Sequence, residues 1–194
     1  MNRYRITLAL TLAASLPLAA HAAPPVGAPR PAARVHDAED RAFDLHGVRG
    51  KPTLVLYEDK DSAKVNLALK DELSNLARGD RYRSAVALVP VADVERYDYW
   101  PVRGFVKDAI RDESRKIGAT IYCDWDGSFR RATRLAKNTS SVMLIGKDGR
   151  VLFAWEGQVP KEERDRLLAL LRAEIEPRAE ASPPPAASPS ARGG

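Results

Sequence analysis

The chain has 194 residues, of which 44% are hydrophobic and 29% charged, and its formal net charge is +5. This length fits one folded domain with tails, and charges of both signs are too interspersed to indicate a nucleic-acid partner. The chain has one cysteine, which excludes an internal disulfide, so the core alone has to stabilise the fold.

The first 22 residues have the parts of a secretory signal peptide. Arg3 and Arg5 are basic, residues 6–18 are apolar, and Ala20-His21-Ala22 is a small-x-small cleavage signal. The apolar run is shorter than the roughly 20 residues that a membrane-spanning helix needs. No cysteine follows the cleavage signal, which argues against a lipid anchor. We therefore expect an exported protein, periplasmic or secreted, that does not span a membrane.

Composition divides the rest of the chain into three parts. Residues 23–35 are rich in proline and alanine, which predicts an extended linker. Residues 179–194 have almost nothing to bury and predict a disordered tail. The folded domain is accordingly expected over residues 36–178.

Apolar runs and helical patterns alternate through this domain. Strands are predicted at 53–57, 85–91 and 120–123, and helices at 61–78 and 101–117. The second helix has an apolar stripe that is expected to be buried. Its members are Val102, Phe105, Val106, Ala109, Ile110 and Ile117.

The last third of the domain predicts a hairpin and a helix. Strands at 142–145 and 150–155 flank the turn Lys147-Asp148-Gly149, and a helix begins at Pro160 and stops at Pro177. The whole order predicts an α/β fold. Its mixed central sheet has helices on both faces and ends in a C-terminal β-hairpin plus helix.

This order resembles the thioredoxin-like fold of the redoxin, TlpA and peroxiredoxin-like superfamily. Lys51-Pro52 before the first strand and the segment SSVMLIGKDGRVLFAWEG sharpen that resemblance. A more specific resemblance is to the YtfJ-type exported proteins. It is carried by Ser62-Ala63-Lys64, Asn66, Arg81-Tyr82, Ser140-Ser141, residues 147–151, Trp155, Gly157, Pro160 and Glu162-Glu163. The resemblance covers roughly residues 42–176 and implies a fold and an exported location, but no established reaction.

The positions that hold redox cysteines in this superfamily hold none here. Counted from Lys51-Pro52, the two thioredoxin-like cysteines fall at Ser62 and Val65, and the peroxiredoxin-like cysteine falls at Asn66. Both chemistries need a thiolate nucleophile. We therefore expect neither dithiol exchange nor peroxide reduction at this junction.

Ser140 takes the position before the hairpin strand where redoxins usually have a cis-proline. A cis bond to a residue other than proline costs about 2.5–4 kcal/mol, so we expect a trans bond. Because the cis-proline loop helps redoxins to hold an extended peptide, its replacement implies an altered groove.

The candidate binding residues surround the start of the first helix. Backbone N–H groups at a helix start can receive an anion. The side chains placed there are Asp61, Ser62, Lys64, Asn66 and Ser140. The alternative is that Asp61 or Ser62 simply caps the helix and that Lys64 is solvated.

Cys123 is the only candidate catalytic group. A free cysteine in an apolar strand is typically buried and inert. The alternative, a one-cysteine thiol oxidoreductase, requires an exposed thiol with a lowered pKa.

Other candidate sites are few. His36 and His46 lack metal-ligand spacing, and we expect no metal and no cofactor. The aromatic residues Tyr97, Tyr99 and Trp100 either pack within their loop or form an edge for a partner, as in a chaperone-like subunit. The sequence favours a non-redox binding protein for an exported protein or a small ligand, and it leaves the oligomeric state open.

Overall fold

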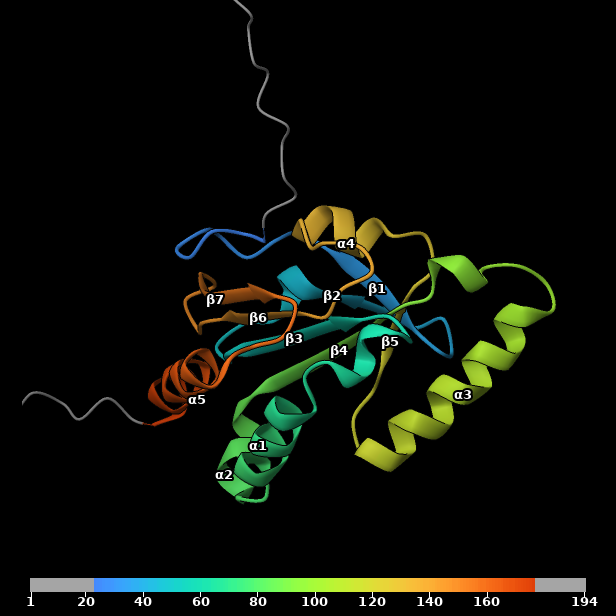
Figure 1. The fold of residues 1–194 in the computed structure, drawn as a ribbon. Coiled ribbons are helices and arrows are strands. Elements are labelled where there is room, and N and C mark those ends of the chain that lie inside the picture. Colours follow the sequence, from blue (N-terminus) through green and yellow to red (C-terminus); the bar gives the residue numbers. More distant parts are fainter. Residues whose placement is uncertain (1–22, 177–194) are drawn as a thin grey trace, which may run out of the picture.

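The computed structural model describes residues 23–176, so the expected signal peptide and C-terminal tail lie outside the described residues. Seven strands form one sheet in the order β2-β1-β5-β4-β3-β6-β7 (Figure 1). The strands are β1 (Arg34–Asp37), β2 (Ala42–Asp44), β3 (Thr53–Glu58), β4 (Ala87–Asp93), β5 (Tyr122–Asp124), β6 (Ser141–Ile145) and β7 (Val151–Glu156). The α-helices are α1 (Leu67–Ala77), α2 (Asp80–Ala85), α3 (Val102–Ile117), α4 (Ser128–Thr133) and α5 (Lys161–Ile175). Three 3₁₀ turns are η1 (Leu45–Gly47), η2 (Ser62–Lys64) and η3 (Glu95–Tyr97).

The strand directions confirm the expected mixed sheet. Strands β3, β4 and β5 are parallel, since helices connect them. Strand β6 runs antiparallel to β3, and β7 returns antiparallel to β6 as the C-terminal hairpin. Gly149 in the hairpin turn has φ +81°, a backbone conformation that glycine adopts without steric cost.

Helices cover both faces of the sheet, as expected for a thioredoxin-like fold (Figure 1). Successive strand residues face opposite sides. Val55 and Tyr57 of β3 therefore pack toward Phe129 of α4, whereas Leu54 packs on the other side with residues of α1 and α5 such as Leu69 and Leu167. Both clusters are closed to solvent, and they hold β3 in the middle of the molecule.

Helix α3 departs from the prediction of a buried apolar stripe. No residue of α3 is fully buried; Val106 and Ile110 are partly buried, and Phe105 is 70% exposed. The neighbouring strand β5 has three residues, and it pairs with β4 only at the C-terminal end of β4. The helical pattern was correct, but so short a strand offers too little surface to cover the whole stripe.

The segment expected as a linker packs against the domain. The N–H of Gly27 donates to Val151 O, and the N–H of Arg30 donates to Gly149 O, each at 2.7 Å. Val35, at the end of this segment, lies in β1 and in the core. The domain therefore begins before residue 36. Proline-rich composition indicates an extended chain, but it does not show which part of the protein that chain contacts. Strands of three or four residues are also too short to show the alternation of apolar and polar residues that predicts a strand.

Arg30 anchors this segment, and its loss is expected to destabilise the fold. The residue is 6% exposed, and its guanidinium donates to Leu45 O, Thr53 Oγ1 and Gly146 O at 3.3–3.4 Å. We expect Arg30→Ala to lower the free energy of unfolding by about 1–3 kcal/mol, because three buried acceptors each lose a hydrogen bond from a charged donor. Urea denaturation measures this. The exposed control Arg115→Ala should change it by less than about 0.5 kcal/mol, and equal stabilities would contradict the anchor.

None of the helices within residues 23–176 combines the length and the apolar character needed to cross a membrane.

Candidate functional site

The junction after β3 consists of two helical pieces rather than one. The turn η2 is followed by α1, and Asn66 between them has φ −111° and ψ 38°, which is not helical. Neither Asp61 nor Ser62 caps α1, because α1 begins at Leu67. The simple cap expected for these two side chains is therefore wrong.

Ser62 closes the turn at the end of β3. Its N–H donates to Asp59 Oδ1 at 2.7 Å, and the N–H of Asp59 donates to Ser62 Oγ at 3.0 Å. Ser62 is buried. At the position of the first thioredoxin-like cysteine, the structure thus has a hydroxyl that accepts one of the two hydrogen bonds closing the turn.

Arg96 of η3 reaches this turn from the end of β4. It contacts Asp59 Oδ2 at 3.3 Å and Asp61 Oδ2 at 3.1 Å. Burial alone would raise the pKa of Asp59, but the hydrogen bonds from Ser62 and the charge of Arg96 outweigh it and hold that pKa below its ordinary value. Asp59 is therefore a stable anion within the turn.

Asn66 joins three segments of the chain. Its Nδ2 donates to Ser140 Oγ at 2.8 Å and to Gly157 O at 3.0 Å, and its Oδ1 accepts the N–H of Val159 at 2.8 Å. The position of the peroxiredoxin-like cysteine is thus occupied by an amide whose donors and acceptor bind neighbouring segments.

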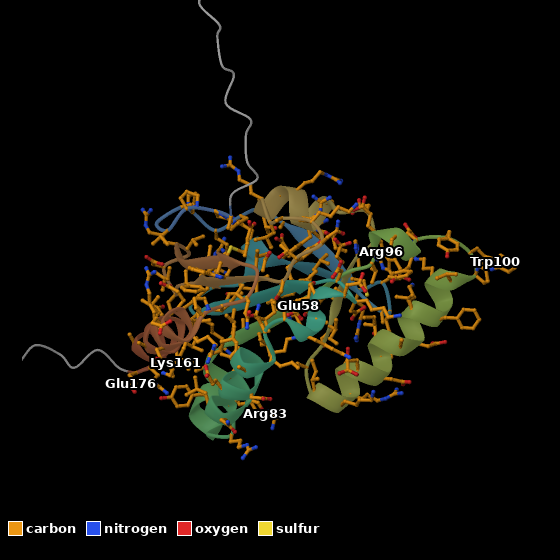
Figure 2. The ribbon with its side chains drawn as sticks, in the orientation of Figure 1. Glu58, Arg83, Arg96, Trp100, Lys161 and Glu176 are labelled. Atoms are coloured by element: carbon orange, nitrogen blue, oxygen red, sulfur yellow. The ribbon has the colours of Figure 1, made fainter. Side chains whose placement is uncertain are left out.

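Ser140 continues this network toward the end of β3. Its hydroxyl donates to Glu58 Oε1 at 2.9 Å, and Glu58 Oε2 pairs with Lys70 Nζ of α1 at 2.6 Å. Within residues 23–176 the cis peptide bond is Trp100–Pro101, so the bond before Ser140 is trans as expected. Figure 2 shows Glu58 near the centre of the molecule.

The five predicted binding residues fall into two groups. Asn66 and Ser140 are in direct contact, and with Ser62 they are buried in internal hydrogen bonds. Asp61 and Lys64 are exposed on the turn above them. Because the buried three are engaged internally, Asp61 and Lys64 are the members whose side chains face solvent.

Sequence reasoning did not single out Glu58, Lys70 or Arg96. A charged residue that ends an apolar strand, as Glu58 does, is a signal that could have been used. Lys70 is in the predicted helix without any distinguishing pattern. Arg96 lies 35 and 37 residues from the carboxylates it contacts, and no local pattern links it to them.

Cys123 of β5 is buried at 1% exposure among Val94, Trp125 and residues of α3. Burial raises the pKa of its thiol to about 12. The expected inert role is consistent with both observations, whereas the alternative enzyme needs an exposed thiol with a lowered pKa.

Two buried carboxylates lie on neighbouring strands under α4. Asp93 of β4 and Asp124 of β5 are register partners, and the hydroxyl of Tyr57 donates to Asp124 Oδ2 at 3.1 Å. Burial raises the pKa of Asp124, although its oxygens also accept the N–H groups of Phe129 and Arg130. This polar cluster is enclosed by the sheet and α4, and sequence reasoning missed it.

The aromatic loop is exposed instead of packed. Trp100 is 91% exposed, and Tyr99 and Phe105 beside it are also exposed, whereas Tyr97 is partly buried. Figure 2 shows Trp100 at the periphery, pointing away from the body of the molecule. The interpretation as loop packing is therefore wrong for Tyr99 and Trp100. We call Tyr99, Trp100 and Phe105 the aromatic tip.

Residues 23–176 bring together no group of three or more His, Cys, Asp or Glu side chains that could hold a metal ion.

Comparison with solved structures gives a consistent picture of the fold. A protein assigned as the thiol:disulfide interchange protein DsbE from Chlorobium tepidum has a TM-score of 0.57 at 14% identity, covering 78% of this chain and 99% of its own. The exposed lipoprotein thioredoxin Etrx1 from Streptococcus pneumoniae has a TM-score of 0.53 at 13% identity, covering 72% and 97%. Bacterioferritin comigratory protein from Xanthomonas campestris has a TM-score of 0.52 at 18% identity, covering 74% and 92%. At these identities the likeness shows a shared thioredoxin-like fold.

Comparison of the sequence adds the family. No match is found among curated protein sequences. Residues 62–174 match the family described as a bacterial protein of unknown function, YtfJ_HI0045. This match covers more than half of the chain and begins at the turn that replaces the redox motif. The chain therefore belongs to the YtfJ_HI0045 family of bacterial proteins and has a thioredoxin-like fold.

Proposed function

We propose that this protein is an exported binding protein that performs no thiol chemistry at the position where redoxins react. One observation carries the proposal: Ser62, Asn66 and Ser140 close that position with internal hydrogen bonds. Each of them stabilises the junction, and none can act as the thiolate that both redoxin chemistries need. The burial of Cys123 supports the same conclusion.

The surface proposed to bind lies directly above this closed junction. It consists of Asp61, Lys64 and Arg96, and we call it the helix-start surface. All three are exposed, and Arg96 is held by Asp61 and Asp59. Because Arg96 is paired with Asp59 and Asp61, the Arg96 and Asp61 side chains of the surface are already ordered, which lowers the ordering cost of binding. The partner is an exported protein or a small polar ligand.

Export rests on the N-terminal sequence pattern, which lies outside the described residues. Fractionation of the producing cells, followed by N-terminal sequencing, tests it. A mature protein that begins at Ala23 supports export, and an uncleaved protein in the cytoplasm would overturn it.

Binding at the helix-start surface predicts a local cross-linking pattern. A photoreactive residue at position 64 should form a specific adduct in the exported fraction, and one at the exposed α3 position 116 should not. In a second test the photoreactive residue is at position 61. Lys64→Glu should then lower the yield of the adduct about tenfold, since a charge at the contact is reversed. Identical adducts from positions 64 and 116 would contradict the surface. Reduction of insulin or peroxide that depends on any residue of the purified protein would contradict the non-redox function itself.

A second candidate function is favoured by the aromatic tip. Exposed Trp and Tyr side chains are frequent anchors at protein interfaces, and a hollow of about 380 Å³ lies beside Trp100, lined also by Pro101, Gly104 and Lys107. In this case the protein is a chaperone-like partner subunit.

Truncation of the aromatic tip separates the two candidates. Trp100→Ala should leave the fold intact, because the side chain is 91% exposed, yet it should weaken a partner that uses the tip by about tenfold or more. Quantitative pull-down from the exported fraction measures this, with Arg115→Ala on α3 as control. If Trp100→Ala captures the partner as well as the original chain does and Lys64→Glu does not capture it, the helix-start surface is the binding site.

A further inference from the structure

A cavity of about 250 Å³ lies over strands β1 and β5, beside the start of α3. Arg34 and His36 are two residues apart on β1 and therefore project from the same face of the sheet. Trp125 follows β5, Asp98 lines the cavity from the loop before α3, and Arg103 lines it from the first turn of α3. Two strands of the sheet and the start of α3 thus form its walls.

The wall at Trp125 is ordered by contacts of its own. The guanidinium of Arg103 lies over the indole ring at 4.4 Å from the centroid, and it also pairs with Asp98. Trp125 is buried, and its Nε1–H has no acceptor among residues 23–176. Because this N–H is itself buried, Trp125 lines the cavity through the rest of its side chain, which offers a largely apolar surface.

The acidic side chains that line the cavity already have donors. Asp98 pairs with Arg103, and Asp124 accepts two backbone N–H groups and a tyrosine hydroxyl. Asp126 accepts the N–H of Ser128 at 3.0 Å, and hydrogen bonds from Ser128 hold the pKa of Asp126 below its ordinary value. These carboxylates therefore need no cationic ligand to satisfy their charge.

Arg34 is different, because its guanidinium has no hydrogen bond or ion pair with any residue of 23–176. A guanidinium presents a rigid fork of N–H donors that fits a carboxylate or phosphate in a bidentate manner. The cavity thus combines an uncommitted oxyanion binder at Arg34 with the aromatic wall of Trp125.

We propose that this cavity binds a small organic monocarboxylate, with the carboxylate on Arg34 and the carbon skeleton beside Trp125. The volume is below the roughly 300–1,000 Å³ of sites for drug-sized ligands, so the ligand is small. The negative charges of Asp98 and Asp126 disfavour a phosphate dianion more than a monocarboxylate. The site shares no residue with the helix-start surface or the aromatic tip residues Tyr99, Trp100 and Phe105, and it is independent of the proposed function.

Titration of the mature protein with sodium benzoate tests this site, at an ionic strength held constant with sodium chloride. The NMR signals are the indole N–H of Trp125, assigned with Trp125→Phe, and the backbone amides of Arg34 and His36. We expect saturable shifts of these signals. Arg34→Gln should weaken binding about tenfold or more, and Arg34→Lys should weaken it less, because it keeps the charge but loses the fork. The exposed control Arg78→Gln should bind as the original chain does.

Three results would overturn the proposal. The first is the absence of saturable shifts up to about 50 mM benzoate, a concentration that would reveal even weak binding. The second is equal affinity in the original chain and Arg34→Gln, since the site would then lie elsewhere. The third is phosphate binding as tightly as benzoate, which would remove the assignment to a monocarboxylate. The side chain of Arg34 is exposed and makes no hydrogen bond or ion pair within residues 23–176, so its variants should fold normally, and circular dichroism checks this.

Discussion

Cys123 in the native protein is expected to react with Ellman's reagent roughly a thousandfold more slowly at pH 8 than the same thiol after unfolding. The thiolate is the reacting species. With its pKa raised to about 12, the native thiol is ionised only to about one part in ten thousand at pH 8, whereas an ordinary thiol with a pKa near 8.5 is about one-quarter ionised. Its burial at 1% exposure slows the reaction further.

The pH dependence of this rate has a definite sign. Below a pKa of about 12 the native rate should rise close to tenfold per pH unit, while the unfolded rate levels off above about pH 9. Stopped-flow absorbance with and without urea measures both, and Cys123→Ser provides the blank. A native rate within about tenfold of the unfolded rate at pH 8 would show an accessible thiolate, and the one-cysteine oxidoreductase would become the better interpretation.

Asn66→Ala is expected to lower the free energy of unfolding by about 2–4 kcal/mol. The substitution removes three hydrogen bonds, and it leaves the buried N–H of Val159 without an acceptor. For a domain with typical stability of about 5–15 kcal/mol this is a large fraction. Urea denaturation should show the midpoint lowered by about 1–2 M.

The control for this prediction lies in α1, the helix that follows Asn66. Asn75→Ala changes an exposed amide of α1 and should alter the free energy of unfolding by less than about 0.5 kcal/mol. Ser140→Ala should cost less than Asn66→Ala, because it removes two of the network's bonds and leaves the bonds to residues 157 and 159 in place. If Asn66→Ala and Asn75→Ala are equally stable, Asn66 does not close the junction, and the site is open to a ligand.

The fold was largely predictable because its central elements are long and regular. The runs at 53–57 and 142–145 are apolar, as expected for strands covered on both faces, and they became β3 and β6. The strands β1 and β2 were missed, since they have four and three residues and follow a proline-rich stretch. Burial on α3 was overestimated, because the pattern shows which face is apolar and not how much sheet lies beneath it.

The candidate site was only partly predictable. Asp61 and Lys64 lie in the exposed part of the junction turn, and their role in binding stays a prediction. The hydrogen bonds of Asn66 and Ser140 could not be predicted, because they join residues 74 and 91 positions apart. Arg96 and Arg34 carried no local signal. They stand out only through the carboxylates that Arg96 contacts and because Arg34 has no hydrogen-bond or ion-pair partner within residues 23–176.

The sequence by itself determined what this junction lacks. Counted from Lys51-Pro52, the redox positions hold Ser62, Val65 and Asn66, and no packing can turn these side chains into a thiolate. Only the tertiary structure decided what the same side chains do instead. Hydrogen bonds need atoms within about 3 Å, and partners so far apart in the chain reach that distance only after β3, β6 and the 157–159 segment have packed together.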